Sequence, residues 1–226
     1  MTATNKSAGS RRLEVFIVDD HPMMREGLAR LINNEPDLRV CGEAGTAGEA
    51  LQSLSAAKPD LVLVDIALPD RSGIELIKAL QAVHPELPVL VISMHDETLY
   101  AERVLRAGGR GYIMKQEGGK QLMQAMRRVL GGQIYVSEKI SARILESVSG
   151  RGLGRYRSPL EKLTDREFEI FQLIGQGHGS RQIAEHLRLS IKTVEVHRLH
   201  IKEKLRLRDA TRSEERRVGK ECRSRW

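Results

Sequence analysis

The sequence predicts an α/β domain with a doubly wound, five-stranded parallel sheet, followed by a small all-α domain. Two observations support this prediction. Over the first 130 residues, short apolar runs alternate with stretches of helical spacing, as in sheets whose strands are joined by crossover helices. In the last third, short helical segments follow one another between glycines and capping residues. A chain of 226 residues has room for two domains of this size.

Five apolar runs are the predicted strands. The stretch PDLVLVDIALPDRSG contains LVLV, and four consecutive apolar residues indicate a strand buried on both faces. The runs are Leu13–Val18, Leu38–Cys41, Leu61–Val64, Val89–Ile92 and Gly111–Met114.

Five stripes of apolar residues at helical spacing follow these runs and predict the helices that cover the two faces of the sheet. They consist of Met23, Met24, Gly27, Leu28, Leu31 and Ile32; Ala50, Leu51 and Leu54; Ile74, Ile77 and Leu80; Val104 and Leu105; and Leu122, Ala125, Met126 and Val129.

Polar side chains stand where the predicted strands end. Asp19 and Asp20 follow the first strand, Asp65 the third, Ser93 the fourth and Lys115 the fifth. Because the carboxyl ends of parallel strands lie at one edge of the sheet, we expect these groups to share one crevice. Singly, each has an ordinary interpretation as a turn former, a helix cap or a solvated group. Their occurrence at four strand ends favours a shared site.

Three clustered carboxylates repel one another unless a cation shares them. Oxygen ligands without a His and Cys pattern typical of zinc sites favour Mg²⁺ over zinc. Lys115 and the Ser93 hydroxyl are suitable donors to phosphoryl oxygens, and an aspartate can form an aspartyl phosphate. Asp70 and Ser72 are interpreted as turn formers or helix caps, because they precede the apolar stripe that begins at Ile74.

The marks VDDH, LVLVDIALPDRSG, VLVISMH and GYIMK together resemble a response-regulator receiver domain with a flavodoxin-like fold, over residues 13–131. The resemblance implies that Asp65 accepts a phosphoryl group from a sensor histidine kinase. It implies a Mg²⁺ site and a phosphoryl-binding switch as well. The implied metal ligands are Asp20, Asp65 and the Ala67 carbonyl directly and Asp19 through water, and the implied switch groups are Ser93, Lys115 and Tyr112. Tyr112 also fits a core aromatic with a wet hydroxyl group.

The net positive charge of the chain comes from its C-terminal third. Residues 1–154 carry 19 Lys and Arg against 19 Asp and Glu, whereas residues 155–226 carry 18 against 11, a net charge of +7. A neutral half joined to a basic half suggests that only the second half meets a polyanion. Residues 212–226 contribute +3 of this excess.

Three short helices are predicted in this part of the chain. Thr164 and Glu167 form a capping-box pair before an apolar face, and Gly175 and Gly177 end that helix. GSRQIAEHLRLS predicts a second helix, and Ser190 caps a third with a basic exposed side. Two short helices at a tight turn suggest a helix-turn-helix.

LTDRE, IAEHL, SIKTVEVH and EKL resemble a LuxR-type helix-turn-helix over roughly residues 160–211, so the whole chain resembles response regulators of the NarL/FixJ type. The resemblance implies that the third helix enters the major groove of DNA. His197 lies on the apolar stripe of that helix, which favours packing over base contact. The residues expected at base edges are Glu195, Val196 and Leu199, and those expected at phosphates are Lys192, Thr193, Arg198 and Lys202.

We therefore expect a phosphorylation-dependent, DNA-binding transcriptional regulator of a two-component system. It would form a homodimer when phosphorylated and would not be an enzyme, apart from self-phosphorylation and slow self-dephosphorylation at Asp65. Two alternatives stay open: a phosphatase or phosphotransferase of aspartyl-phosphate type, and a constitutive DNA-binding protein whose receiver is a structural or partner-docking module. Because no targeting signal or membrane-spanning run is visible, and Cys41 and Cys222 lie far apart, we expect a cytoplasmic protein without membrane contact.

The remaining segments complete the expected domain organisation. Residues 1–12 are expected to be disordered, 132–158 to be a linker with one further helix near 137–148, and 159–211 to be the helix-turn-helix domain. Residues 212–226 show no apolar periodicity and depart from the family, which has a fourth helix there. We interpret this tail as foreign to the family and expect a less stable, less readily dimerising DNA-binding domain.

Overall fold

The structure, a computed structural model, describes residues 11–148, 159–187 and 189–207. The chain divides into two compact units, Met1–Leu153 and Gly154–Trp226, which are described separately. The expectations for residues 1–10, for the Gly- and Arg-rich stretch 149–158 and for the tail 212–226 lie outside the described residues.

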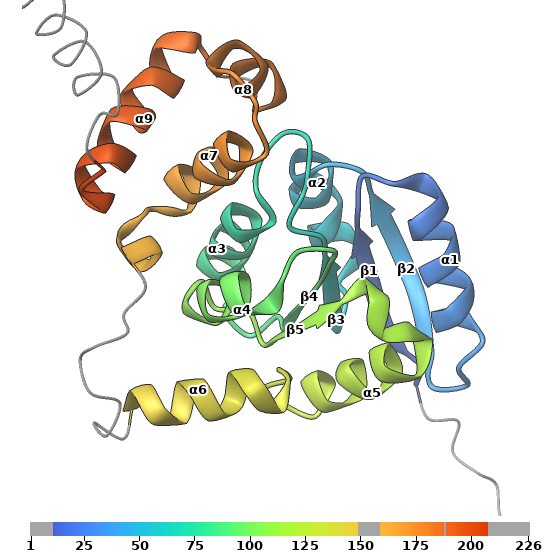
Figure 1. Cartoon of the computed structure of the whole chain (residues 1–226). Helices are drawn as coiled ribbons and strands as arrows, with labels where there is room; N and C mark the ends of the chain where they lie inside the picture. Colours follow the sequence, from blue (N-terminus) through green and yellow to red (C-terminus); the bar gives the residue numbers. More distant parts are fainter. Residues whose placement is uncertain (1–10, 149–158, 188, 208–226) are drawn as a thin grey trace, which may run out of the picture. The chain divides into compact units, whose positions relative to one another are not determined.

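The first unit is built on a five-stranded parallel sheet (Figure 1). Its strand order, β2-β1-β3-β4-β5, is that of a doubly wound sheet in which the chain reverses direction across the sheet between β1 and β3. The strands are β1 (Leu13–Val18), β2 (Leu38–Ala44), β3 (Leu61–Val64), β4 (Val89–Ser93) and β5 (Gly111–Met114). The predicted α/β fold class is confirmed.

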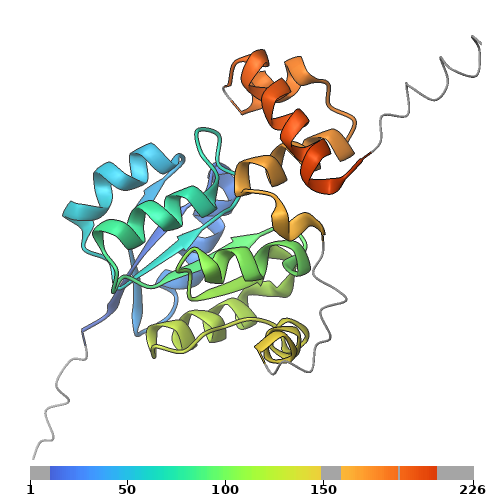
Figure 2. The ribbon, with the colours of Figure 1, turned by 90° about the vertical axis from the view of Figure 1, so that its left-hand side faces the viewer.

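Helices cover both faces of this sheet (Figures 1 and 2). One face packs on α1 and α5, and alternate strand residues such as Ile17 and Leu63 form its apolar core. The other face lies under α2, α3 and α4. Because helices cover both faces of the sheet, the central strand β3 is fully buried, as its run of four apolar residues predicted. The helices are α1 (Pro22–Asn33), α2 (Ala47–Ala57), α3 (Gly73–Val83), α4 (Glu97–Arg106) and α5 (Gly118–Leu130).

The predicted end of the second strand at Cys41 was wrong, because β2 continues through Ala44. The pairing with β1 shifts by one residue here: Val40 faces Val15, but Gly42 faces Phe16, so Cys41 is a bulge residue. A Cβ atom on Gly42 would lie 2.5 Å from the Phe16 ring, so a glycine is needed there. The half-buried Cys41 thiol donates to the Val15 carbonyl at 3.4 Å.

The apolar stripe of α1 is narrower than the sequence suggested. Leu28 and Ile32 are buried against the sheet, but Met23 is 82% exposed and Leu31 is 44% exposed. A helix at the edge of a sheet buries only the residues that point directly at the strands, so the outer members of the stripe remain in solvent.

A sixth helix, α6 (Glu138–Val148), follows at the place where a further helix was expected. The chain before it runs beside β5, where Tyr135 forms a parallel bridge with Gly111. Ile140 is buried, and α6 packs against α4. The predicted linker therefore begins as an ordered part of the first unit.

The second unit contains three α-helices in its described residues: α7 (Asp165–Gly175), α8 (Ser180–His186) and α9 (Ile191–Leu205). Thr164 and Glu167 form the expected capping box of α7, and Ser190 caps α9. The small core of the unit consists of Leu163, Phe168, Ile170, Ile183, Ala184, Val194 and Ile201. In the part of the chain that the structure describes, no helix has the length and apolar character needed to cross a membrane.

Candidate functional site

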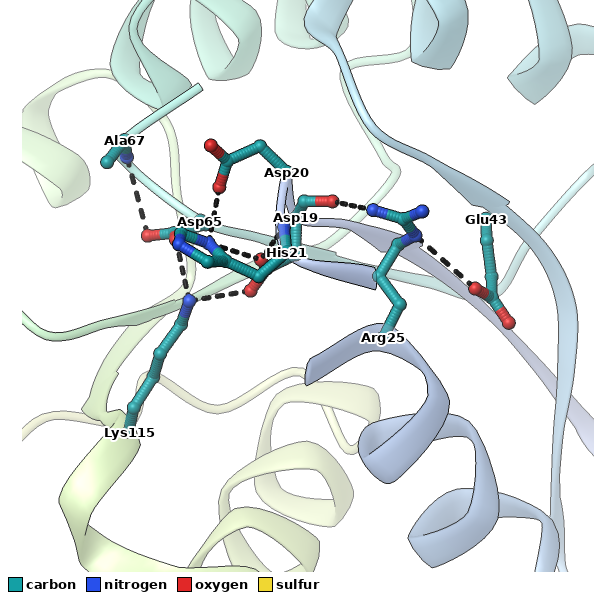
Figure 3. Close-up of polar contacts among 8 residues, drawn as sticks. All are labelled: Asp19, Asp20, His21, Arg25, Glu43, Asp65, Ala67 and Lys115. Atoms are coloured by element: carbon teal, nitrogen blue, oxygen red, sulfur yellow. Dashed lines mark hydrogen bonds and ion pairs between the residues drawn. The ribbon is translucent and has the colours of Figure 1, made fainter. Parts of the chain in front are cut away.

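Three strand ends of the first unit bring two carboxylates and an ammonium group into direct contact (Figure 3). Asp19 follows β1, Asp65 follows β3 and Lys115 follows β5. The Lys115 Nζ atom lies 2.6 Å from Asp19 Oδ2 and 2.6 Å from Asp65 Oδ2. Asp19 is fully buried and Asp65 is 3% exposed. The topology therefore joins groups that are 96 and 50 residues apart in the chain.

Lys115 is held in its charged form by its partners. Burial acts to lower the pKa of the ammonium group, but the hydrogen bonds to Asp19 and Asp65 outweigh burial and raise the pKa above its usual value. One ammonium group thus faces two buried carboxylates and the nearby Asp20.

The acidic cluster fits a divalent cation. The side chains of Asp19, Asp20 and Asp65, together with His21, each offer a ligand atom within 4.8 Å of the others. Asp20 Oδ1 is buried and has no hydrogen-bond partner, although His21 Nδ1 lies 2.6 Å away in a geometry that makes no hydrogen bond. A buried carboxylate oxygen without a donor is costly unless a cation binds it. The carboxylate set therefore matches a hard ion such as Mg²⁺.

The turn after β1 is braced from two sides. Asp19 Oδ1 accepts a hydrogen bond from the backbone N–H of His21 at 2.8 Å. The Arg25 guanidinium donates to the Asp19 carbonyl at 2.6 Å and lies 3.5 Å from the Glu43 carboxylate (Figure 3). These contacts fix the direction in which the two aspartates leave the strand.

The loop between β3 and α3 carries Asp65 and Ala67, the latter exposed beside the cluster. The Ala67 N–H points at Asp65 Oδ1 across 3.4 Å, and the Gly73 N–H donates to the Ile66 carbonyl at 2.8 Å. Ser72 caps α3, as predicted, by accepting from the Ile74 N–H at 3.3 Å.

Asp70 caps a helix, as the sequence suggested, but the helix is α2 and not the α3 that follows it in the chain. Its two carboxylate oxygens accept hydrogen bonds from the N–H groups of Ala47 and Gly48 at 2.9 and 2.8 Å, so it caps α2. Burial acts to raise the pKa of Asp70, but these backbone donors outweigh it and hold the pKa below its usual value. Asp70 therefore ties the loop that carries Asp65 to the N-terminus of another helix.

Ser93 and Tyr112 meet at the loop between β4 and α4. Ser93 is fully buried, and its hydroxyl accepts from the His95 N–H at 3.3 Å. The Tyr112 hydroxyl donates to the His95 carbonyl at 2.7 Å, and burial raises the pKa of this 1%-exposed side chain. Tyr112 is thus a core aromatic whose hydroxyl is bonded to the loop that also contacts Ser93.

The first turn of α4, which follows this loop, contacts α6 and the residue before it. Glu97, the first residue of α4, accepts a hydrogen bond from the Ser137 hydroxyl at 2.7 Å. Arg143 of α6 donates to the Thr98 carbonyl at 3.2 Å. A chain of contacts therefore runs from Ser93 to the ordered start of the linker.

In the second unit, most of the predicted DNA-contacting residues lie on the exposed side of α9. Val194 and Ile201 are buried on the other side. Thr193 and Arg198 are half-buried, and the Thr193 hydroxyl lies 2.7 Å from that of Ser190. The exposed members are Lys192, Glu195, Val196, Leu199 and Lys202.

His197 lies toward the packed side of α9. Its Nδ1 atom is buried without a hydrogen-bond partner, and burial lowers the pKa of the ring. Burial therefore favours the neutral form of the ring, which agrees with a packing role.

Sequence reasoning missed one buried ionic contact in this unit. Glu167 is 3% exposed, and its two carboxylate oxygens accept from Lys204 Nζ at 2.8 and 2.6 Å while the Thr164 N–H donates at 2.8 Å. Burial acts to raise the pKa of Glu167, but these donors lower it below its usual value. The capping-box spacing revealed Glu167, but only the packing of α7 on α9 shows that Lys204 neutralises it.

The sequence matches two families, one for each unit. Residues 15–127 match the response regulator receiver domain, and residues 161–213 match the bacterial regulatory proteins of the luxR family. The receiver match covers the sheet with its five covering helices, and the luxR match covers α7, α8 and α9.

Similar proteins match most or part of the chain. The oxygen regulatory protein NreC of Staphylococcus aureus is 36% identical over 200 residues, which are 87% of this chain and 92% of that protein. A LuxR-family two-component response regulator from Aurantimonas sp. SI85-9A1 is 33% identical, with a TM-score of 0.57 over 61% of this chain and 99% of that one. RcsB of Salmonella enterica serovar Typhimurium, solved on promoter rprA with the phosphomimetic BeF3-, shares the fold at 24% identity, with a TM-score of 0.63 over 89% of this chain and 96% of that one.

A buried acidic cluster at the carboxyl edge of a doubly wound sheet, joined to a helix-turn-helix unit, defines a signal receiver with a DNA-binding output. The chain belongs to the two-component response regulators, and within them to the NarL/FixJ type with a LuxR-type DNA-binding domain. It is a phosphorylation-dependent, DNA-binding transcriptional regulator.

Proposed function

We propose that Asp65 is the phosphoacceptor of this regulator and that a sensor histidine kinase is its donor. The observation that supports this is the contact of Asp65 with Lys115 at 2.6 Å, in a cluster with two further carboxylates. An Asp65 carboxylate oxygen attacks the phosphorus of the kinase phosphohistidine, the N–P bond breaks, and the histidine nitrogen leaves with the electron pair. The product is an acyl phosphate on Asp65.

Asp20, Asp65 and the Ala67 carbonyl would hold a Mg²⁺ ion, with Asp19 acting through water. The bound ion would supply positive charge that offsets the charge of the phosphoryl oxygens during transfer. Lys115 and the Ser93 hydroxyl donate hydrogen bonds to the same oxygens once the phosphoryl group is present. For Lys115 this means exchanging a carboxylate partner for a phosphoryl oxygen.

The movement of Ser93 toward the phosphoryl group changes the loop that precedes α4. The Ser93 hydroxyl accepts a hydrogen bond from the His95 N–H, and the Tyr112 hydroxyl donates one to the His95 carbonyl. The loop and the tyrosine therefore respond together. Glu97 then transmits the change to Ser137 at the start of α6. Phosphorylation thereby shifts the population of the α4 face and of the linker, which releases the DNA-binding unit or promotes a homodimer.

The chain is a stoichiometric switch that turns over no external substrate beyond its own phosphorylation and slow dephosphorylation. A dimer of helix-turn-helix units binds a two-part site in double-stranded DNA. We place this activity in the cytoplasm, where a bacterial regulator meets both its kinase and its DNA.

Two other functions would give different experimental results. An aspartyl-phosphate phosphatase would turn over a small phosphorylated substrate catalytically, and it gives no reason for the luxR-type unit. A constitutive DNA-binding protein would bind its operator equally well with and without phosphorylation. The acidic cluster, complete in all its groups, favours the switch over both.

The test is phosphate incorporation from radiolabelled acetyl phosphate, followed by operator selection from sheared genomic DNA. We expect Mg²⁺-dependent labelling that is lost in Asp65→Asn and retained in Asp60→Asn, a matched change at an aspartate outside the cluster. Labelling that persists in Asp65→Asn would refute the phosphoacceptor assignment. Equal enrichment of DNA with and without phosphorylation would favour the constitutive protein.

A further inference from the structure

The exposed side of α9 has an unusual composition for a surface that faces DNA. Lys192, Glu195, Val196 and Leu199 recur at the spacing of one helix face. Val196 is 46% exposed and Leu199 is 55% exposed, and Glu195 is exposed between them. A carboxylate and two large apolar side chains thus occupy the centre of this face. The two apolar side chains are poorly solvated by water, and the carboxylate would be repelled by a phosphate backbone.

We propose that Glu195 accepts a hydrogen bond from the N4 amino group of a cytosine, and that Val196 and Leu199 contact thymine methyl groups, in the major groove of each operator half-site. This inference rests on the proposed function and adds the base chemistry of its DNA site.

The argument for cytosine follows from the groups that bases display in the major groove. Guanine presents two acceptors and thymine presents an acceptor, and both repel a carboxylate. Adenine places the N7 acceptor beside its N6 donor, so a carboxylate gains one contact and suffers one repulsion. Cytosine alone offers a donor, N4, without a neighbouring acceptor on its own edge. Glu195 therefore favours cytosine and also excludes the other bases by repulsion.

The carboxylate of Glu195 is available for this contact. No hydrogen bond or ion pair engages it within the described residues, in contrast to Glu167 of α7, which pairs with Lys204 of α9. A carboxylate placed against phosphates would be repelled, so a base donor is the favourable partner when the helix lies in the groove.

The apolar pair has one matching group in the groove. The C5 methyl of thymine is the apolar feature that the major-groove edge presents, and burial of exposed Val196 and Leu199 against it removes apolar surface from water. Lys192, on the same face, is placed to contact a phosphate and fix the register without reading sequence.

The first experiment is selection of random duplex DNA by the full chain, phosphorylated with acetyl phosphate and Mg²⁺, using wild type and Glu195→Gln. Wild type should select a motif with an invariant cytosine next to thymine. Glutamine pairs with the N6 and N7 atoms of adenine, so Glu195→Gln should replace that cytosine by adenine and leave the rest of the motif unchanged. At the selected site, exchanging the cytosine should weaken wild type roughly tenfold.

The second experiment replaces single thymines of the selected site by deoxyuridine, which removes only the C5 methyl group. Wild type should lose roughly fourfold in affinity for each contacted methyl group. Leu199→Ala or Val196→Ala should abolish the effect at one thymine each. Lys192→Ala is the matched control, because it should weaken binding to all sequences alike and keep both the motif and the deoxyuridine effect.

The outcomes separate this inference from the proposed function. An unchanged motif in Glu195→Gln, or a deoxyuridine effect that survives both alanine variants, overturns the base assignment and leaves phosphorylation-dependent DNA binding intact. Failure of the wild type to enrich any motif, phosphorylated or not, overturns the proposed function and this inference with it.

Discussion

Asp70 lies outside the acidic cluster, yet the structure predicts that its loss destabilises the receiver in a pH-dependent way. Its carboxylate accepts two backbone N–H groups at the N-terminus of α2, at 2.9 and 2.8 Å. In Asp70→Asn one oxygen can still accept a hydrogen bond, but the amide NH₂ group faces the second N–H and the negative charge at the helix N-terminus is lost. Loss of such a cap costs about 1.5 kcal/mol.

This cost corresponds to a measurable shift in melting temperature. For the unit that spans residues 11–148, the unfolding entropy is roughly 0.3 kcal/mol/K, so about 1.5 kcal/mol lowers the melting temperature by about 5 °C. Differential scanning calorimetry of the full chain measures the shift. Glu26→Gln is the matched control, because Glu26 is an exposed carboxylate on α1 whose ion-pair partner among the described residues is Arg30. Its melting temperature should change by less than about 1 °C.

The sign of the pH dependence follows from the lowered pKa of Asp70. A carboxylate whose pKa is lower in the folded state stabilises that state above the unfolded pKa, about 3.9. The stabilisation is lost as the pH falls through the folded pKa. The gap between wild type and Asp70→Asn should therefore be complete at pH 7 and pH 5 and shrink below about pH 4. Equal melting temperatures at pH 7, or a gap that stays constant to pH 3, would refute the reasoning.

Three further changes test other parts of the structure. Gly73→Ala should unfold the receiver or destabilise it by more than about 2 kcal/mol, because a Cβ atom there would overlap the Asp65 carbonyl oxygen. Urea titration measures this loss of stability. A variant as stable as the wild type would contradict the packing of the loop. Lys204→Met should destabilise the second unit by about 1 kcal/mol, because it removes the ammonium group that pairs with the buried Glu167 and because the Lys204 side chain is itself 35% exposed. The double variant with Glu167→Gln should recover much of the loss in calorimetry, and an unchanged single variant would argue against the ion pair. Tyr112→Phe should keep Asp65 labelling by acetyl phosphate within twofold. It should reduce the gain in DNA affinity on phosphorylation, because it removes the hydroxyl contact to the loop before α4. A full gain in a DNA-binding assay would exclude that contact from signalling.

The local patterns of the sequence were enough for the fold class and for most element boundaries. Buried parallel strands need continuous apolar runs, so β1, β3 and β5 have the predicted ends. Polar residues directly after such runs must leave the sheet at its carboxyl edge, which is why Asp19, Asp65 and Lys115 were expected to meet. Capping residues such as Ser72 and Thr164 act within three residues of their own position and were recognised for that reason.

Features that depend on distant partners came only from the tertiary structure. At the bulge at Cys41 the Phe16 ring lies against Gly42, and nothing near Cys41 in the sequence indicates that approach. Asp70 caps α2 instead of α3 because the loop after β3 passes the N-terminus of a helix 22 residues earlier.

The same distinction applies to the functional groups. Residue type and order predicted a phosphoryl- and metal-binding site at the strand ends and a DNA-contacting face on α9, and these roles stay predictions. The tertiary structure determined which carboxylates share the Lys115 ammonium group, which buried oxygen of Asp20 is left without a donor, and that Lys204 neutralises Glu167. The physical reason is that a hydrogen bond or an ion pair requires its two groups in contact, and only the packing of whole elements brings groups so distant in the chain to that distance.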